Sequence, residues 1–341
     1  MNVSHMNLTI FKIAKEFDKS VLYVKYMVTC RNILYKAVSI KNNCFVIRLT
    51  DQQTRTKEQL ESELHFQDYL FKNGADVTKP LKTVKDEWIS DCIVDNRKYY
   101  VSAFTFAKGL NWYERDDKNP ETFYQIGKAL GKVHKLSKNY ESISYKRRKW
   151  YEQQELANAP ELFKDYSTEL YNSFMNFVGE MKTMKNNQET YGLIHGDYLM
   201  SNYLINQDKV TIIDFDECEY SWFAMDLAIC IRNYLVGDEP ERIHEKTDLA
   251  EKICYNLLSG YQTENTITED MIFDLNKYIC VRDYIEISQM LNLIKQGRTL
   301  CDIENRLLKA DIDRVLNDKP FLKIDFNKLL NTFSKGNSHL I

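Results

Sequence analysis

The sequence lacks the features that mark membrane proteins and secreted proteins. It contains no run of 18 apolar residues, so it predicts no membrane-spanning helix. Its first ten residues have neither the basic start nor the apolar core of a signal peptide. The eight cysteines are scattered without a CxxC pair, which argues against a disulfide framework or a cysteine zinc site. These absences predict a protein of the reducing cytoplasm with no membrane partner.

Composition predicts a large globular protein. The chain has 341 residues, of which 44% are hydrophobic and 13% aromatic, enough to bury a sizeable core. The first 105 residues carry more basic than acidic side chains, and the remainder carries more acidic ones. A basic first part suits an anionic ligand. The basic run at residues 146–149 lies on a predicted loop, where such charges are usually solvated, so we predict no nucleic-acid partner.

One segment carries a recognisable chemical pattern. Residues 194–202 read Ile-His-Gly-Asp-Tyr-Leu-Met-Ser-Asn, and Asp-Phe-Asp follows at 214–216. Phosphoryl transfer needs one carboxylate to orient an acceptor hydroxyl and further oxygen ligands to hold a metal ion on nucleotide phosphates. Asp197 suits the first role, and Asn202 and Asp214 suit the second. Short β-prone runs at 203–205 and 210–213 flank a polar turn, so we expect a hairpin that returns Asp214 to Asn202.

These motifs resemble those of the aminoglycoside phosphotransferase and choline kinase-like family, which shares the protein-kinase architecture. The residue between His195 and Asp197 is glycine, whereas protein kinases usually have arginine there, and Asp216 stands where they have glycine. Because Asp197 already supplies the carboxylate, we expect His195 to hold the loop backbone by hydrogen bonds rather than to act as a base. The resemblance implies that Asp226, at the start of a helix, braces the same loop. The motifs that carry the resemblance lie within residues 194–228.

The resemblance also implies a nucleotide-bracing ion pair in the first third of the chain. Residues 44–49 predict a strand that contains Arg48, and residues 56–71 predict an amphipathic helix that ends at 73–74. By resemblance, Arg48 braces the phosphates and Glu63 is its partner, with Glu61 as the alternative. The backbone at Thr105 and Ala107 falls where a kinase hinge would contact adenine.

The turn that would cover the phosphates departs from the family pattern. No glycine occurs between Val21 and Ile40, so the sequence has no glycine-rich loop there. Backbone N–H groups near this turn, or the side chains of Thr29 and Asn32, remain as candidates for contacting a phosphate.

The element pattern predicts an α+β chain with a small lobe and a larger, mostly helical lobe, and the resemblance implies that these form a two-lobed protein kinase-like fold. We expect a small antiparallel-sheet lobe with one main helix at residues 1–104, a hinge at 105–109, and a larger, mostly helical lobe at 110–341. Strands are expected at 88–94 and 97–104. Helices are expected at 121–136, 227–235, 243–258, 270–294 and 302–316.

The resulting hypothesis is an ATP- and Mg²⁺-dependent phosphotransferase that moves the γ-phosphate to a hydroxyl of a small molecule. A bacterial stress-type protein serine/threonine kinase is the alternative enzyme, and a nucleotide-binding scaffold without turnover is the alternative of another class. Asp216, Glu217, Glu219 and Arg282 are candidate acceptor contacts. Glu217 and Glu219 could equally be exposed loop charges.

Overall fold

The structure, a computed structural model, describes residues 3–40, 43–142, 145–237 and 239–334. The chain divides into two compact units. Unit 1 comprises Met1–Leu110, Tyr140–Arg147 and Leu204–Asp216, and unit 2 comprises Asn111–Asn139, Arg148–Tyr203 and Glu217–Ile341. No helix in the described part of the chain is long and apolar enough to cross a membrane.

Unit 1 is built on a six-stranded antiparallel sheet. The strand order is β1-β2-β3-β6-β4, and β5 also pairs with β6. The strands are β1 (Val21–Thr29), β2 (Ile33–Ser39), β3 (Cys44–Asp51), β4 (Pro80–Leu81), β5 (Ser90–Val94) and β6 (Arg97–Thr105). This is the antiparallel-sheet lobe that the sequence predicted.

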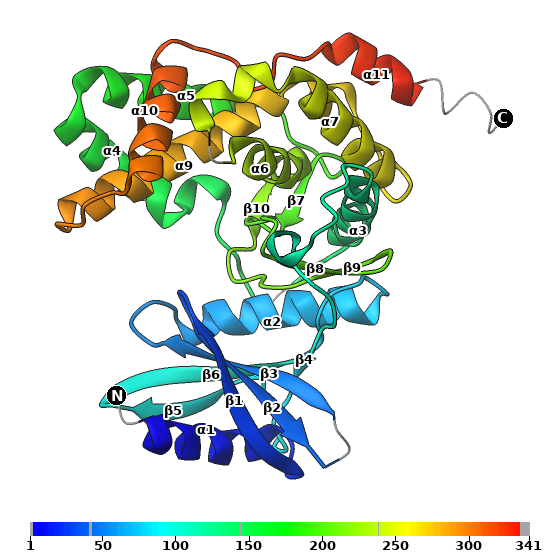
Figure 1. Ribbon diagram of the computed structural model, residues 1–341, viewed down its shortest axis with the longest axis vertical. Helices are drawn as coiled ribbons and strands as arrows, with labels where there is room; N and C mark the ends of the chain where they lie inside the picture. The colour runs from blue at the N-terminus through cyan, green and yellow to red at the C-terminus, as the bar shows by residue number, and fades with distance from the viewer. Residues whose placement is uncertain (1–2, 41–42, 143–144, 238, 335–341) are drawn as a thin grey trace. The chain divides into compact units, whose positions relative to one another are not determined.

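Two helices cover the two faces of this sheet, α1 (Val3–Phe17) on one and α2 (Lys57–Lys72) on the other (Figure 1). Side chains alternate between faces along a strand. Phe45, Ile47 and Leu49 of β3 therefore pack in the core beneath α1. The same alternation turns Arg48 toward the face that α2 covers.

Helix α2 begins at a capping box. The Thr56 side chain accepts a hydrogen bond from the backbone of Gln59, whose own side chain accepts from the Thr56 backbone. Leu60 and Leu64 then pack against Phe104 and Ile89. This packing fixes the rotation of α2 about its axis, and that rotation decides which carboxylate meets Arg48.

The predicted hairpin joins β8 (Tyr203–Asn206) to β9 (Lys209–Ile212), and the two strands form a sheet of their own. Within unit 1, Ile212 forms a parallel bridge with Val77, and its backbone N–H donates to Asp76 O at 2.8 Å. The end of β9 is thereby held beside the segment that follows α2, and Phe215, three residues further on, packs against Phe66 of α2.

Unit 2 is mostly helical, as predicted. Its one described sheet pairs β7 (Tyr191–Ile194) with β10 (Glu219–Trp222). Its α-helices are α3 (Thr122–Ser137), α4 (Gln154–Tyr166), α5 (Thr168–Thr183), α6 (Phe223–Val236), α7 (Thr247–Gln262), α8 (Glu269–Phe273), α9 (Leu275–Lys295), α10 (Asp302–Leu316) and α11 (Phe326–Ser334). Helices α3 and α7 lie side by side (Figure 1). Glycine allows this close approach, because a Cβ on Gly127 would stand 1.9 Å from Leu257 O.

Two predicted helix boundaries are wrong. The helix expected at 243–258 begins at Thr247, because Lys246 is non-helical (φ −96°, ψ 26°) and residues Pro240–Glu245 form a 3₁₀ turn. The helix expected at 270–294 is two helices, α8 and α9, which are separated at Asp274 (φ −89°, ψ 5°). Apolar periodicity continues through both irregularities, so the sequence pattern did not reveal them.

Candidate active site

The predicted catalytic loop follows β7 in unit 2. Its central residue, Gly196, has φ +79°, a conformation that side chains disfavour. A Cβ at this position would stand 2.3 Å from the backbone oxygen of Glu217. The close approach of these two backbones explains why glycine separates His195 from Asp197.

Asp226 of α6 holds the backbone of this loop. Its two carboxylate oxygens accept hydrogen bonds from the N–H groups of His195 at 2.8 Å and Gly196 at 2.9 Å. The His195 ring also contacts the loop, because Nδ1 accepts from the Asp197 N–H at 3.3 Å. Asp226 lies in the first turn of α6, which begins at Phe223 rather than at Asp226.

His134 of α3 is a further member of this brace. The sequence indicated only a helix cap or a packing residue. In the structure its Nε2 lies 3.0 Å from Asp226 Oδ2, and its ring stacks on Phe223 at 4.8 Å. Burial lowers the pKa of His134, whereas Asp226 raises it, and the net shift is downward. A neutral His134 that donates to Asp226 fits this environment.

The side chain of Asp197 is held by two neighbouring side chains and is otherwise partly exposed. Its Oδ2 accepts from Asn202 Nδ2 at 3.1 Å, and its Oδ1 accepts from Arg282 Nη1 at 3.3 Å. Asn202 also donates to the backbone oxygen of Asp197 at 2.8 Å. The side chain of Asp197 keeps 26% of its surface exposed. Such a fixed and accessible carboxylate can accept a hydrogen bond from a substrate hydroxyl.

In unit 1, Arg48 is paired with Glu63. Arg48 Nη1 and Nη2 donate to the two Glu63 oxygens at 2.7 and 2.8 Å, and both residues are buried. Burial alone would lower the pKa of Arg48, but the Glu63 carboxylate raises it above its usual value. Glu61, the alternative partner, lies instead near Lys57 at 3.9 Å.

Asp214 adopts an unusual backbone conformation beside this pair. Its φ is +63°, and its side chain is 49% exposed. Arg48 Nη1 lies 3.8 Å from Asp214 Oδ1, so the pair and the predicted metal ligand adjoin. Phe215 is fully buried and packs edge-on against Phe66 of α2 at 6.0 Å. Buried Phe215 thus fixes Asp214 in an orientation that leaves its carboxylate accessible.

Asp216 is buried among arginines of unit 1. Arg55 donates to its two carboxylate oxygens at 3.2 and 3.3 Å, and Arg147 donates to its backbone oxygen at 2.6 Å. Arg31 Nη1 lies 3.8 Å from Oδ2. Burial alone would raise the pKa of Asp216, but the nearby guanidinium groups lower it below its usual value.

Glu217 and Glu219 are not exposed loop charges, since 8% and 3% of their surfaces are accessible. Arg148 pairs with both, donating to Glu219 Oε2 at 3.0 Å and to Glu217 Oε2. The interpretation of residues 146–149 as a solvated basic run is therefore wrong for Arg147 and Arg148. Their partners lie about 70 residues further along the chain, so local sequence could not reveal them.

Arg282 lies on α9, whose position depends on a buried charge network that the sequence analysis missed. Arg232 of α6 donates to Asp283 Oδ1 of α9 at 2.6 Å and to Asp311 Oδ2 of α10 at 2.7 Å. Arg314 of α10 donates to the same two carboxylates. Arg232 and Arg314 thus connect α6, α9 and α10. These contacts hold α9 in the position from which Arg282 reaches Asp197. The available sequence signal was Arg232 itself, which with Asp226 is one of only two charged residues on the mostly apolar helix α6.

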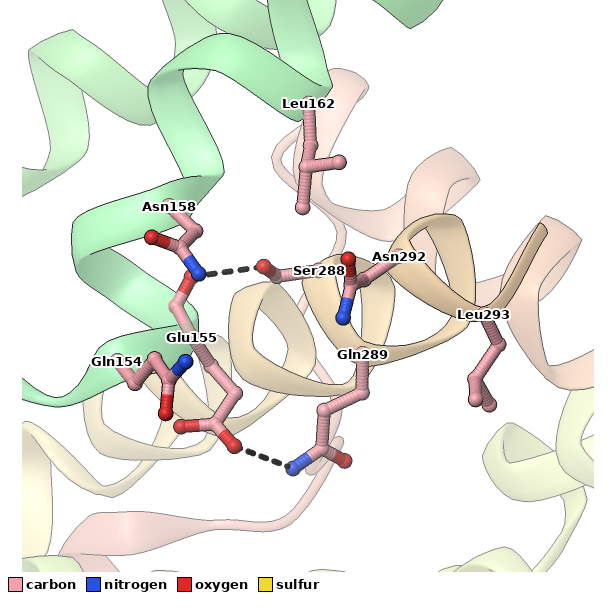
Figure 2. A pocket seen from close by; sticks show the side chains of 8 residues that line it. All are labelled: Gln154, Glu155, Asn158, Leu162, Ser288, Gln289, Asn292 and Leu293. Atoms are coloured by element: carbon pink, nitrogen blue, oxygen red, sulfur yellow. Dashed lines mark hydrogen bonds between the residues drawn. The ribbon is translucent and has the colours of Figure 1, made fainter. Parts of the chain in front are cut away.

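A cavity of about 330 Å³ lies between α4 and α9 (Figure 2). Most of the residues that line it have polar side chains: Gln154, Glu155, Asn158, Leu162, Ser288, Gln289, Asn292 and Leu293. Ser288 Oγ donates to the backbone oxygen of Glu155 at 2.7 Å, and Gln289 Nε2 lies 3.4 Å from its carboxylate. Gln289 stands seven residues after Arg282, so the two share one face of α9.

The residues predicted to ligate a metal, Asn202 of unit 2 and Asp214 of unit 1, are oxygen donors. In the described residues, no three His, Cys, Asp or Glu side chains form a group able to hold a metal on their own. The predicted ligands, Asn202 and Asp214, supply oxygen atoms, which are the ligands that Mg²⁺ prefers. Mg²⁺ commonly binds through one or two protein oxygens together with phosphates and water.

At the predicted hinge, Thr105 is already engaged in the sheet. Its N–H donates to Lys79 O at 2.9 Å, and its Oγ1 accepts from Lys79 N at 2.9 Å. The N–H of Phe106 donates to Cys44 O at 3.3 Å. Ala107, the next residue, is half-buried at the end of these contacts.

Comparison with known proteins agrees with this geometry. The amicoumacin kinase of Bacillus subtilis (strain 168) is 22% identical over 332 residues, which cover 96% of this chain and 97% of that protein. A solved structure of amicoumacin kinase hAmiN in complex with AMP-PNP, Ca²⁺ and Ami has a TM-score of 0.81 at 20% identity, covering 96% of this chain and 100% of that one. A microcompartment-associated aminopropanol kinase has a TM-score of 0.67 at 14% identity, with coverages of 93% and 98%.

The structural likenesses confirm the predicted kinase-like fold. Residues 36–255 match the phosphotransferase enzyme family, a span that includes Arg48, the catalytic loop and Asp226. Because this span is more than half of the chain, the protein belongs to the phosphotransferase enzyme family.

Proposed function

We propose that the protein transfers the γ-phosphate of Mg²⁺-bound ATP to a hydroxyl of a small molecule. The observation that carries this proposal is the environment of Asp197. A guanidinium and an amide orient its carboxylate, while part of it stays accessible to an acceptor. In this role Asp197 orients the hydroxyl for in-line attack and accepts its proton.

For the nucleotide, we propose that Arg48 contacts the phosphates and that Asp214 and Asn202 ligate Mg²⁺. The bidentate Glu63 pair supports the role of Arg48, because it holds the guanidinium in one orientation. The adenine contact is assigned to the backbone at Ala107, since the N–H of Thr105 is engaged by Lys79. The AMP-PNP and Ca²⁺ in the amicoumacin kinase complex support a nucleotide with a divalent cation.

On the acceptor side, we propose Arg282 as a direct contact because it reaches Asp197. Asp216, Glu217 and Glu219 are buried and paired with arginines. We therefore propose that these carboxylates act through their arginine partners. Beyond Arg282, the same face of α9 carries Glu286, whose Oε1 accepts from Arg282 Nε at 3.0 Å.

The acceptor is proposed to be a polar, hydroxylated small molecule that carries amine or amide groups. Arg282, Glu286, Gln289 and Leu293 share one face of α9, and the last two line the cavity of Figure 2. An acceptor whose hydroxyl lies at Asp197 could extend along this face. Amide and carboxylate side chains there suit its hydrogen-bonding groups. The names of the relatives, an amicoumacin kinase and an aminopropanol kinase, support this class.

We further propose the cytoplasm as the site of action. All eight cysteines are free thiols, as expected in a reducing compartment. Cell fractionation with a tagged chain would test this assignment, and recovery outside the cytoplasm would contradict it.

The function is tested by a transfer screen with γ-labelled ATP and Mg²⁺. Acceptors should include amino alcohols, sugars, aminoglycosides, amicoumacin-type molecules and serine-containing proteins. We expect label in a small molecule and none without a divalent cation. Label only in protein would favour the protein-kinase alternative, and ATP binding without any transfer would favour the scaffold.

A further inference from the structure

A chain of buried polar side chains leads from the end of α7 to the catalytic loop. Asn265 Nδ2 lies 2.8 Å from the hydroxyl oxygen of Tyr261, and that oxygen lies 3.0 Å from His134 Nδ1. On the other side of the ring, His134 Nε2 lies 3.0 Å from Asp226 Oδ2. All four residues are buried and belong to unit 2. Buried polar groups need hydrogen-bond partners, and each of these side chains finds one in the next.

Glycines at the contact between α3 and α7 bring the two ends of this chain together. A Cβ on Gly131 would stand 2.6 Å from the backbone oxygen of Tyr261, and a Cβ on Gly260 would stand 1.8 Å from that of Tyr124. The two helices therefore lie side by side at close range (Figure 1). Tyr261, in the last turn of α7, thereby reaches His134 of α3, and the two rings meet edge-on at 5.6 Å.

The direction of the hydrogen bonds in this chain follows from one backbone N–H. The N–H of Thr266, which can only donate, contacts Asn265 Oδ1 at 3.0 Å. The Nδ2 group of Asn265 therefore donates to Tyr261. Because its oxygen accepts from Asn265, the Tyr261 hydroxyl has its one hydrogen left for His134 Nδ1. Nδ1 is then unprotonated, and neutral His134 carries its hydrogen on Nε2, which faces Asp226.

This proton order suits the contacts of Asp226 with the catalytic loop. Asp226 Oδ2 accepts from His134 and from the His195 N–H, and Oδ1 accepts from the Gly196 N–H. A hydrogen on Nδ1 of neutral His134 would leave two acceptors, Nε2 and Oδ2, facing each other in a buried site. A doubly protonated ring would neutralise charge on Asp226 that the two N–H groups use. The Tyr261 hydroxyl opposes both states, since it occupies Nδ1.

We propose that Tyr261 and Asn265 are positioning residues for phosphoryl transfer, which act by keeping the hydrogen of His134 on Nε2. Asp226 then stays bound to the loop, and Asp197 stays in place for the acceptor hydroxyl. Both residues act through His134 rather than by contact with a substrate. The inference rests on the proposed function, because the reaction that benefits is the transfer assigned to Asp197.

Tyr261→Phe removes the hydroxyl and keeps the ring, so it breaks the chain at its centre. We expect kcat to fall about tenfold, less than the roughly 100-fold that a displacement of about 1 Å can cost. Affinity for Mg-ATP, measured by calorimetry, should change less than about twofold, because the lost contact serves the transfer step. Tyr284→Phe is the matched control, since Tyr284 is equally buried and its hydroxyl lies 2.8 Å from Ser173 Oγ. Its kcat should stay unchanged.

Asn265→Asp tests the direction of the hydrogen bonds. The variant keeps the size of the side chain and an acceptor for the Thr266 N–H, but a carboxylate has no hydrogen to donate. The Tyr261 hydroxyl would then donate to the new carboxylate and leave His134 Nδ1. We expect kcat to fall about as far as in Tyr261→Phe. The double variant should lose no more than either single one, because both changes break the same chain, whereas independent effects would add.

The ring of His134 provides a readout that does not depend on activity. ¹⁵N spectra at about pH 8, where an ordinary histidine is neutral, should show a hydrogen on Nε2 and none on Nδ1. The signal is assigned with His134→Gln. The Nδ1 signal should shift in Tyr261→Phe and in Asn265→Asp but stay in place in Tyr284→Phe.

A packing role of Tyr261 predicts lower thermal stability of Tyr261→Phe with kcat unchanged, and that result would overturn this inference alone. A hydrogen on Nδ1 of the unmodified chain would do the same. The absence of phosphoryl transfer by the unmodified chain to every acceptor of the screen would overturn the proposed function and this inference together.

Discussion

At the scale of single residues, the backbone conformation of Asp214 is a feature that the sequence does not show. Asp214 has φ +63°, which non-glycine residues rarely adopt. Such strain persists where the surroundings enforce it, and here the buried Phe215 that follows provides the anchor. The sequence predicted the identity of Asp214 as a metal ligand. It could not predict the backbone strain, which arises from packing against Phe66, about 150 residues earlier.

Removal of the Asp214 carboxylate should separate metal binding from nucleotide binding. We expect Asp214→Ala to lose the Mg²⁺-dependent part of the thermal stabilisation by ATP. ATP without metal should stabilise the variant and the unmodified chain to a similar extent. Thermal unfolding with ATP, with and without Mg²⁺, provides the measurement. Equal Mg²⁺ dependence in the two proteins would rule out Asp214 as a ligand.

The sequence alone could not decide whether Glu63 or Glu61 pairs with Arg48. Both residues lie on the predicted helix, two positions apart, and the pattern alone did not fix its rotation. Packing of Leu60 and Leu64 on the sheet turns Glu63 inward, so that it is fully buried against Arg48. The pairing therefore depended on contacts with Phe104 and Ile89 in other parts of unit 1.

Neutralising Glu63 should impair both stability and activity. Glu63→Gln leaves Arg48 buried with an uncharged partner, so we expect a loss on the order of 2 kcal/mol or more in the free energy of unfolding. We also expect kcat to fall about 10- to 100-fold as Arg48 loses its fixed orientation. Glu61→Gln is the control, and denaturant unfolding with steady-state kinetics gives both readouts. A benign Glu63→Gln beside a damaging Glu61→Gln would reverse the assignment.

Among the elements, the catalytic loop depends on two strands and one helix of unit 2. Strand β7 delivers the loop, β10 pairs with β7, and α6 supplies Asp226. The sequence predicted the loop and the hairpin after it, because these residues are close in the chain, and the family resemblance implied the bracing aspartate. It did not predict that His134 of α3 completes the brace, since that contact spans 92 residues.

The glycine at the centre of the loop should tolerate no side chain. Gly196→Ala combines a left-handed φ with a Cβ only 2.3 Å from Glu217 O, so the loop must shift. Displacement of Asp197 by about 1 Å could lower kcat roughly 100-fold. Gly74→Ala is a matched control, because Gly74 has φ +82° but nothing within 4 Å of the added Cβ. Its kcat should stay unchanged, and similar kcat losses in both variants would contradict the steric account.

The brace should also make stability depend on pH. The folded-state pKa of His134 is lowered by burial below that of the unfolded chain, which is about 6.5. The unfolded chain therefore binds the proton more tightly than the folded chain. The contribution of neutral His134 to the free energy of unfolding is at its maximum above about pH 6.5. This contribution is lost as the pH falls through the folded-state pKa of His134. Urea unfolding between pH 7.5 and 5 should show a smaller decline in His134→Gln. Parallel curves for the two proteins would exclude His134 as the titrating group.

At the scale of the whole molecule, the fold class followed from the sequence more completely than the site did. Strand alternation and helical periodicity are local signals, and they predicted the α+β organisation. The kinase-like fold that the family resemblance implied is confirmed by the solved structures. Local signals did not reveal the break at Asp274 or the Arg232 network that connects α6, α9 and α10. The Arg232 network arises from contacts between helices, and it holds α9, the helix that carries Arg282.

The central claim is that Asp197 orients the acceptor hydroxyl in phosphoryl transfer. Asp197→Asn keeps the size of the side chain and one acceptor oxygen but removes the charge and the ability to take a proton. The most direct test is the kcat of this variant with the acceptor found in the transfer screen, measured beside its affinity for Mg-ATP. Asp208→Asn, at the exposed turn between β8 and β9, serves as the control.

We expect Asp197→Asn to fold, to bind Mg-ATP with nearly unchanged affinity, and to lose about 100-fold or more in kcat. The Asp208→Asn control should retain full activity. Transfer by Asp197→Asn within a few-fold of the unmodified protein would contradict the account.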